Sequence, residues 1–94
     1  MSMPVYSIAL SSTATQILLT SANAFQGITI RETAGSAATV KVWDNATTGA
    51  GTLLGTYGLA ALGSVDRDFA VPRQAKNGIT VTVTGTIEGS VFFG

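Results

Sequence analysis

Hydrophobic and polar side chains alternate without a break along residues 77–85, which read Asn-Gly-Ile-Thr-Val-Thr-Val-Thr-Gly. Period two places Ile79, Val81 and Val83 on one face of a strand and the intervening threonines on the other. A dry face opposite a face that tolerates water is typical of an antiparallel sheet covered on one side only. Glycine near both ends of the run indicates turns. The segment therefore predicts a strand bounded by two turns.

Similar segments recur about every ten residues, the spacing expected of a sandwich or barrel. Strands are predicted at residues 4–10, 14–20, 25–33, 38–44, 52–57, 64–71, 79–84 and 86–93. Pro72 is expected to end the sixth strand because proline has no backbone N–H. Residues 58–63 fit either a loop or one helical turn. The chain is therefore predicted to be a single domain, residues 1–94: an all-β, antiparallel β-sandwich of about eight short strands, with a jelly roll as one arrangement.

The first dozen residues have two interpretations. Residues 1–12 are either a strand of the domain or an N-terminal arm that pairs with the exposed sheet edge of a neighbour. Their start lacks the positive region and long apolar core of a secretory signal. No apolar run approaches the roughly 20 residues that span a bilayer. We therefore expect synthesis in the cytoplasm and no membrane partner.

Composition predicts association with other protein. Charged residues make up 11% of the chain, against about 25% in typical domains, and the formal net charge is zero. A chain of 94 residues has a thin stability margin, and the absence of cysteine removes disulfides. Few charges oppose contact between copies. Self-association is the expected source of further stability, with a sparsely charged monomer as the alternative.

The chain contains few residues of the types that usually catalyse reactions. The chain has no histidine and no cysteine, the usual general base and thiol nucleophile. Its basic residues are scattered, which disfavours nucleic-acid binding. We expect no enzyme and no cofactor. Asp66 and Asp68, two apart on one strand face, could hold a cation, but a solvated strand face is the favoured interpretation.

Trp43 is a candidate contact residue. It is predicted to lie opposite Val40 and Val42, on the outer face of its strand. With Tyr57 and Phe92 near it, Trp43 could stack on a sugar ring. The favoured interpretation is packing or a subunit contact, because aromatic side chains are enriched at interfaces.

Four segments carry a family resemblance: residues 30–44 (IRETAGSAATVKVWD), 51–56 (GTLLGT), 77–85 (NGITVTVTG) and 89–93 (GSVFF). Together, within residues 25–94, they resemble small structural proteins of tailed bacteriophages, of the head-decoration or cement kind. The resemblance implies a β-sandwich subunit, commonly trimeric, bound to the outside of a capsid lattice. It brings no catalytic or cofactor residues.

The resemblance also sets the expected function. The chain is expected to be a virion structural protein that binds the major capsid protein, or another virion protein, and stabilises the head. The alternative is a carbohydrate- or receptor-binding module of a phage head fibre or tail, with Trp43 as the stacking residue.

Overall fold

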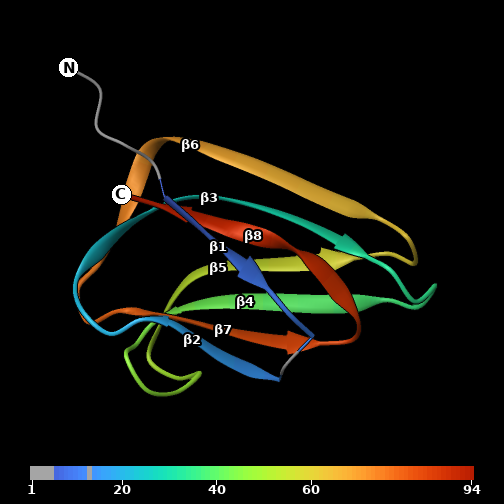
Figure 1. The fold of residues 1–94 in the computed structure, drawn as a ribbon, viewed down its shortest axis with the longest axis horizontal. Helices are drawn as coiled ribbons and strands as arrows, with labels where there is room; N and C mark the ends of the chain where they lie inside the picture. Colours follow the sequence, from blue (N-terminus) through green and yellow to red (C-terminus); the bar gives the residue numbers. More distant parts are fainter. Residues whose placement is uncertain (1–5, 13) are drawn as a thin grey trace.

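The computed structural model describes residues 6–12 and 14–94, and this part of the chain forms eight strands and no helix (Figure 1). The strands are β1 (Tyr6–Leu10), β2 (Thr15–Leu19), β3 (Asn23–Glu32), β4 (Ala38–Asp44), β5 (Thr52–Leu59), β6 (Ser64–Ala75), β7 (Ile79–Thr84) and β8 (Ile87–Phe93). The predicted all-β antiparallel sandwich is confirmed.

Two four-stranded sheets form the sandwich, with strand orders β1-β8-β3-β6 and β2-β7-β4-β5. Every pair of neighbouring strands is antiparallel. The pairing is nested: β1 pairs with β8, β2 with β7, β3 with β6 and β4 with β5. Successive strands therefore change sheet, except at the β4–β5 connection (Figure 1).

The core lies between the sheets and follows from period-two alternation. In β4, Val40 and Val42 are fully buried, whereas Lys41 and Trp43 on the other face are half-buried, as predicted. Burying a valine or isoleucine side chain contributes about 1.5–3 kcal/mol, so inner faces of this kind supply most of the stability. The buried apolar residues are Leu10, Phe25, Ile28, Ile30, Ala38, Val40, Val42, Leu54, Tyr57, Leu59, Ala75, Ile79, Val81, Val83, Ile87 and Val91.

The predicted end of the sixth strand at Pro72 is wrong, because β6 continues to Ala75. β6 is the edge strand of its sheet, and proline is tolerated where its missing N–H would face solvent. Its pairing with β3 also shifts: Asp68 lies opposite Gly27 and Arg73 opposite Phe25. Residues 69–72 therefore bulge from the edge.

Two connections bear on the open alternatives. Residues 58–63 are the end of β5 followed by a tight turn, closed by a hydrogen bond from the Gly63 N–H to the Ala60 carbonyl (2.9 Å). Residues 6–10 pair with β8 of the same chain, and the Ser12 hydroxyl accepts the Ile87 N–H (3.0 Å). Residues 6–12 thus belong to the domain. The rest of the proposed N-terminal arm lies outside the described residues.

Candidate functional site

The two outer faces of the sandwich differ in charge. On the outer face of β1-β8-β3-β6, neighbouring rows contain Arg31 beside Glu88, then Asp66, then Asp68. On the outer face of β2-β7-β4-β5, the rows contain Lys41 as the charged residue, surrounded by threonines. Depletion of charge is the compositional sign of an interface centre. The outer face of β2-β7-β4-β5 is therefore the candidate site.

An apolar row crosses this outer face. Register places Ile17 of β2 beside Thr80 of β7, Thr80 beside Trp43 of β4, and Trp43 beside Leu53 of β5. Ile17 is 48% exposed and Leu53 is 45% exposed. We call Ile17, Trp43 and Leu53 the apolar row. Leu53 lies beside the half-buried indole, and Ile17 lies beyond the fully buried Thr80.

The connection between β4 and β5 holds Trp43 in place. The indole Nε1–H donates to the Thr82 hydroxyl (3.0 Å), and the Thr80 hydroxyl donates to the Asn45 carbonyl (2.8 Å). The backbone at Gly49 passes so close to Thr82 that a Cβ there would overlap the threonine methyl group. The polar edge of the indole is thus occupied within the protein, so Trp43 is a fixed anchor of the apolar row.

Asn45 shapes this connection. Its side-chain carbonyl accepts the N–H groups of Thr47 (2.9 Å) and Thr48 (3.1 Å), and its amide donates to the Ala50 carbonyl (3.0 Å). Such asparagine turns fix a loop by mimicking backbone hydrogen bonds. The Asn45 side chain therefore fixes the shape of the connection, and the Thr80 hydroxyl joins it to the sheet.

The three aromatic residues singled out from the sequence do not come together. Tyr57 belongs to the core, with its hydroxyl over Gly55. Phe92 lies on the outer face of the other sheet, where its ring packs over Gly27. The expectation that both rings lie near Trp43 is therefore wrong, and the structure builds no stacking platform from these three residues.

Tyr57 has an unusual environment. Its buried hydroxyl has no hydrogen-bond partner among the described residues. Burial raises the pKa of this phenol above its usual value, against the lowering effect of the Arg73 and Arg67 charges. Arg73 instead donates from Nη1 to the Leu54 carbonyl, and its guanidinium lies 4.5 Å from the centre of the Phe69 ring. These contacts fasten β6 to β5, the edge strands of the two sheets.

Asp66 and Asp68 do share the outer face of β6, and both are exposed. Within residues 6–12 and 14–94, no group of three or more His, Cys, Asp or Glu residues is placed to hold a metal ion. Lys41 lies on the other sheet, away from these two carboxylates. Asp66 and Asp68 therefore lie on an exposed strand face.

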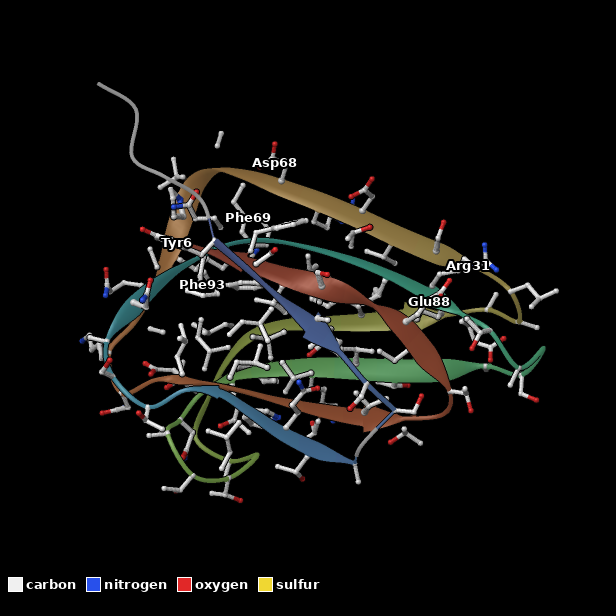
Figure 2. The ribbon with its side chains drawn as sticks, viewed as in Figure 1. Tyr6, Arg31, Asp68, Phe69, Glu88 and Phe93 are labelled. Carbon is white, nitrogen blue, oxygen red and sulfur yellow. The ribbon has the colours of Figure 1, made fainter. Side chains whose placement is uncertain are left out.

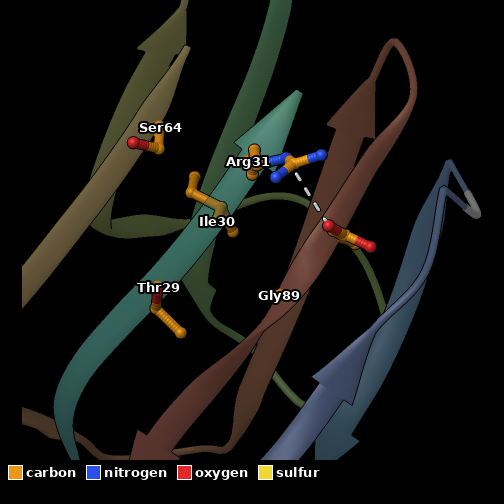
Figure 3. Close-up of a pocket in the computed structure, with 6 residues that line it drawn as sticks. Thr29, Ile30, Arg31, Ser64 and Gly89 are labelled. Carbon is orange, nitrogen blue, oxygen red and sulfur yellow. Dashed lines mark ion pairs between the residues drawn. The ribbon is translucent and has the colours of Figure 1, made fainter. Parts of the chain in front are cut away.

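A hollow of about 370 Å³ lies on the charged outer face, lined by Thr29, Ile30, Arg31, Ser64, Glu88 and Gly89 (Figure 3). Arg31 Nε and Glu88 Oε1 are 3.6 Å apart across it, and both side chains are exposed. Figure 2 shows this pair at the end of the sheet opposite Tyr6 and Phe93. Because the two charges neutralise each other in water, the hollow offers no concentrated charge to a ligand.

Two carboxylates that the sequence did not single out fix the loops. Glu32 is fully buried, and its oxygens accept N–H groups from Ala34 (2.7 Å), Gly35 (2.7 Å), Ser36 (3.1 Å) and Leu62 (2.9 Å). The Leu62 hydrogen bond is the largest influence on its pKa; with the other three it holds the pKa below its usual value, although burial opposes this.

Asp44, the last residue of β4, acts in the same way. It accepts the Asn77 N–H (2.8 Å) and so joins the end of β4 to the β6–β7 connection. Burial alone would raise the pKa of Asp44, but the backbone N–H groups of Asn77, Lys76 and Gly78 hold it below its usual value. Glu32 and Asp44 therefore hold loops in place through hydrogen bonds from backbone N–H groups, and both carboxylates are buried.

Comparison of the chain with protein-family models, with curated proteins and with solved structures found no match. Among the described residues, no helix has the length and apolar character needed to span a membrane. The function is therefore argued from the surface of the chain itself.

Proposed function

We propose that the chain is a structural subunit of a tailed-phage virion: a capsid decoration or cement protein that associates with its own copies, bound to the outside of the head. The observation that carries this proposal is the charge-depleted outer face of β2-β7-β4-β5, with exposed Leu53 beside the anchored Trp43 and exposed Ile17 across Thr80 from it. This face would contact the major capsid protein. The resemblance noted from the sequence supplies the setting, including the trimer.

The strand pairing supports the same proposal. If one long hairpin of eight strands is wrapped into two sheets, the first strand pairs with the eighth, the second with the seventh, and so on inward. The nested pairs β1–β8, β2–β7, β3–β6 and β4–β5 follow this scheme. We infer that the sandwich is a jelly roll, an architecture used by viral capsid domains and also by lectins.

Such a subunit stabilises a shell without chemistry. Each contact of a small face is modest, but linking several copies makes later contacts intramolecular. Linked binding of this kind can exceed the single affinity by about 10²–10⁴-fold. A subunit made in the host cytoplasm would in this way clamp neighbouring capsid proteins and resist rupture of the head. This role needs no enzyme activity, cofactor or nucleic acid.

The alternative role, a carbohydrate- or receptor-binding module of a head fibre or tail, has less support. It depended on an aromatic platform around Trp43, whereas Tyr57 lies in the core and Phe92 lies on the other sheet. A glycan titration followed by tryptophan fluorescence would still detect such a role, because Trp43 is the single tryptophan of the chain.

The test is binding to expanded phage heads that lack the subunit. We expect the wild-type protein to pellet with the heads and to raise the temperature at which they rupture. Leu53→Asp should weaken binding at least about tenfold, since it places a charge in the apolar row. Val71→Asp is the matched control, because Val71 is 82% exposed but lies in the bulge of β6. Failure of the wild-type protein to bind heads, or equal loss in both variants, would contradict the proposal.

A further inference from the structure

The charges of this chain are confined to its last two thirds. Residues 1–30 contain no Asp, Glu, Lys or Arg, and the first charged residue is Arg31. This uncharged stretch includes all of β1 and β2 and most of β3. The positions of β1 and β2 in the fold therefore matter. A strand at a sheet edge normally carries charged side chains, which prevent association with another edge.

The topology places both strands of this stretch, β1 and β2, on one side of the sandwich. β1 is an edge strand of one sheet and β2 is an edge strand of the other (Figure 1). Gln16 fastens them together, since its side-chain amide donates to the Ala9 carbonyl (3.0 Å) and its oxygen accepts the Ser11 N–H (3.0 Å). We call the described residues of this flank, 6–12 and 14–19, the uncharged side.

The opposite side of the sandwich carries features that prevent edge-to-edge association, and the uncharged side lacks them. Its edge strands are β5 and β6. β6 presents Asp66, Arg67 and Asp68, then the bulge with Pro72, and then Arg73, which covers the Leu54 carbonyl of β5. Charges, bulges and proline are the devices that prevent edge-to-edge contact. β6 is therefore built to stay solvated, whereas β5 beside it carries no charged residue.

The uncharged side also exposes apolar surface. Tyr6 is 55% exposed and stacks on Phe93 with ring centres 5.8 Å apart (Figure 2). Ile17 is 48% exposed, and Ile8 and Leu18 are half-buried. Aromatic side chains on a surface without charge are the composition expected at the centre of a protein contact.

The absence of charge on the uncharged side indicates which kind of partner binds there. A partner with an ordinary charged surface would bury its charges against a side that offers no opposite charge, which is costly. A second copy that presents the same uncharged side buries no charge at all. A contact between like surfaces also fits closed symmetry, either about a two-fold axis or with three copies facing a three-fold axis.

We infer that the uncharged side is the surface through which copies of this chain associate. The inference deepens the proposed function and rests on it for the biological setting. It assigns the two contacts to adjoining surfaces that meet at Ile17 of β2: the uncharged side joins copies, and the outer face of β2-β7-β4-β5 contacts the head. Association would also add stability to a small fold that has no disulfide.

The test compares two double variants of the full chain by sedimentation equilibrium. Ser7→Lys with Ala9→Lys places two charges on exposed positions of β1. Ser64→Lys with Ala70→Lys places the same charges on exposed positions of β6, the other edge strand of the same sheet. Because all four positions are exposed, both variants should fold, which circular dichroism and thermal unfolding would check.

We expect the wild-type protein and the β6 variant to sediment as multiples of 9.6 kDa with the same dissociation constant. The β1 variant should have a dissociation constant at least about tenfold larger, because like charges then face each other. A wild-type protein that stays monomeric, or a β1 variant that associates as tightly as the β6 variant, would overturn the inference.

Head binding measured on the same samples separates this inference from the proposed function. Association that the β1 variant weakens, in a protein that ignores heads, would support the inference and contradict the proposed function. A monomeric wild-type protein that binds heads would do the reverse. Loss of head binding in the β1 variant of such a monomer would show that the capsid, rather than a second copy, occupies the uncharged side.

Discussion

The two outer faces of this sandwich belong to sheets of four strands each, but their outward side chains differ in charge. One carries Arg31, Asp66, Asp68 and Glu88, and the other carries Lys41 among threonines and the apolar row. Both inner faces are apolar and fully buried at their centres. The difference leads us to propose a division of roles: the core specifies the fold, and the distribution of a few charges decides which surfaces stay in water. Four predictions test this division.

The largest effect is expected from the inner faces, which should be equivalent. Ile28 of β3 and Ile79 of β7 are both fully buried, one on each sheet. Ile28→Ala and Ile79→Ala should each lower the free energy of unfolding by about 2–5 kcal/mol through lost burial and a cavity. Urea denaturation would measure this, with Thr29→Ala on the charged outer face as the control. A change below about 0.5 kcal/mol for either isoleucine variant would refute a shared core.

The buried carboxylates predict acid sensitivity. The pKa values of Glu32 and Asp44 in the folded protein lie below their ordinary values of 4.5 and 3.8. Their contribution to stability is therefore fully present above those ordinary values and is lost as the pH falls through the lowered folded-state values. Glu32→Gln and Asp44→Asn should each lower stability at neutral pH and flatten its fall on acidification.

Urea midpoints measured from neutral pH to about pH 2 would check this prediction. Glu88→Gln is the control, because Glu88 is exposed and its pair with Arg31 lies in solvent. A wild-type midpoint that does not change across the acid range would show that neither carboxylate stabilises the fold in its charged form.

A smaller effect is expected where Trp43 is anchored. Trp43→Phe removes the hydrogen bond to the Thr82 hydroxyl and should cost about 0.5–1.5 kcal/mol. Thr82→Val removes the same bond from the other side. A double-mutant cycle should therefore show coupling between the two positions, and additive losses would mean that the bond does not contribute.

The smallest effect is expected on the charged face. Arg31 and Glu88 are 62% and 64% exposed, so their ion pair should be worth about 0–1 kcal/mol and should weaken with salt. Removing both charges with Arg31→Gln and Glu88→Gln should leave the urea midpoint nearly unchanged. A loss of more than about 2 kcal/mol would show that this face contributes more to the fold than its exposure indicates.

Alternation made most of the fold predictable, and β4 was predicted with its observed bounds, residues 38–44. Tyr57 shows where alternation fails. Trp43 pairs with Leu53, but Val42 pairs with Gly55, so Leu54 is an extra residue in β5. Strict alternation from the exposed Leu53 would put Tyr57 on the outer face, whereas one extra residue turns it into the core.

The role of Glu32 could not be predicted for a different reason. Its partners are backbone N–H groups, one of which belongs to Leu62 in a distant turn. Leu62 adopts a positive φ of 57°, which its side chain gives no reason to expect. Every residue except proline has a backbone N–H, so the sequence does not show which of these groups bind Glu32. The absence of charge from residues 1–30, in contrast, can be read directly from the sequence, but only the strand order shows that β1 and β2 lie on one side.

The most direct test of the account is a reconstruction by electron microscopy of heads bound by the wild-type protein. The account predicts subunits on the outside of the shell, with the apolar row of Ile17, Trp43 and Leu53 against the capsid protein. Asp66 and Asp68 should face solvent, and the uncharged sides of neighbouring copies should meet. Subunits that turn the Asp66 and Asp68 face to the shell, or heads that carry no subunit at all, would contradict it.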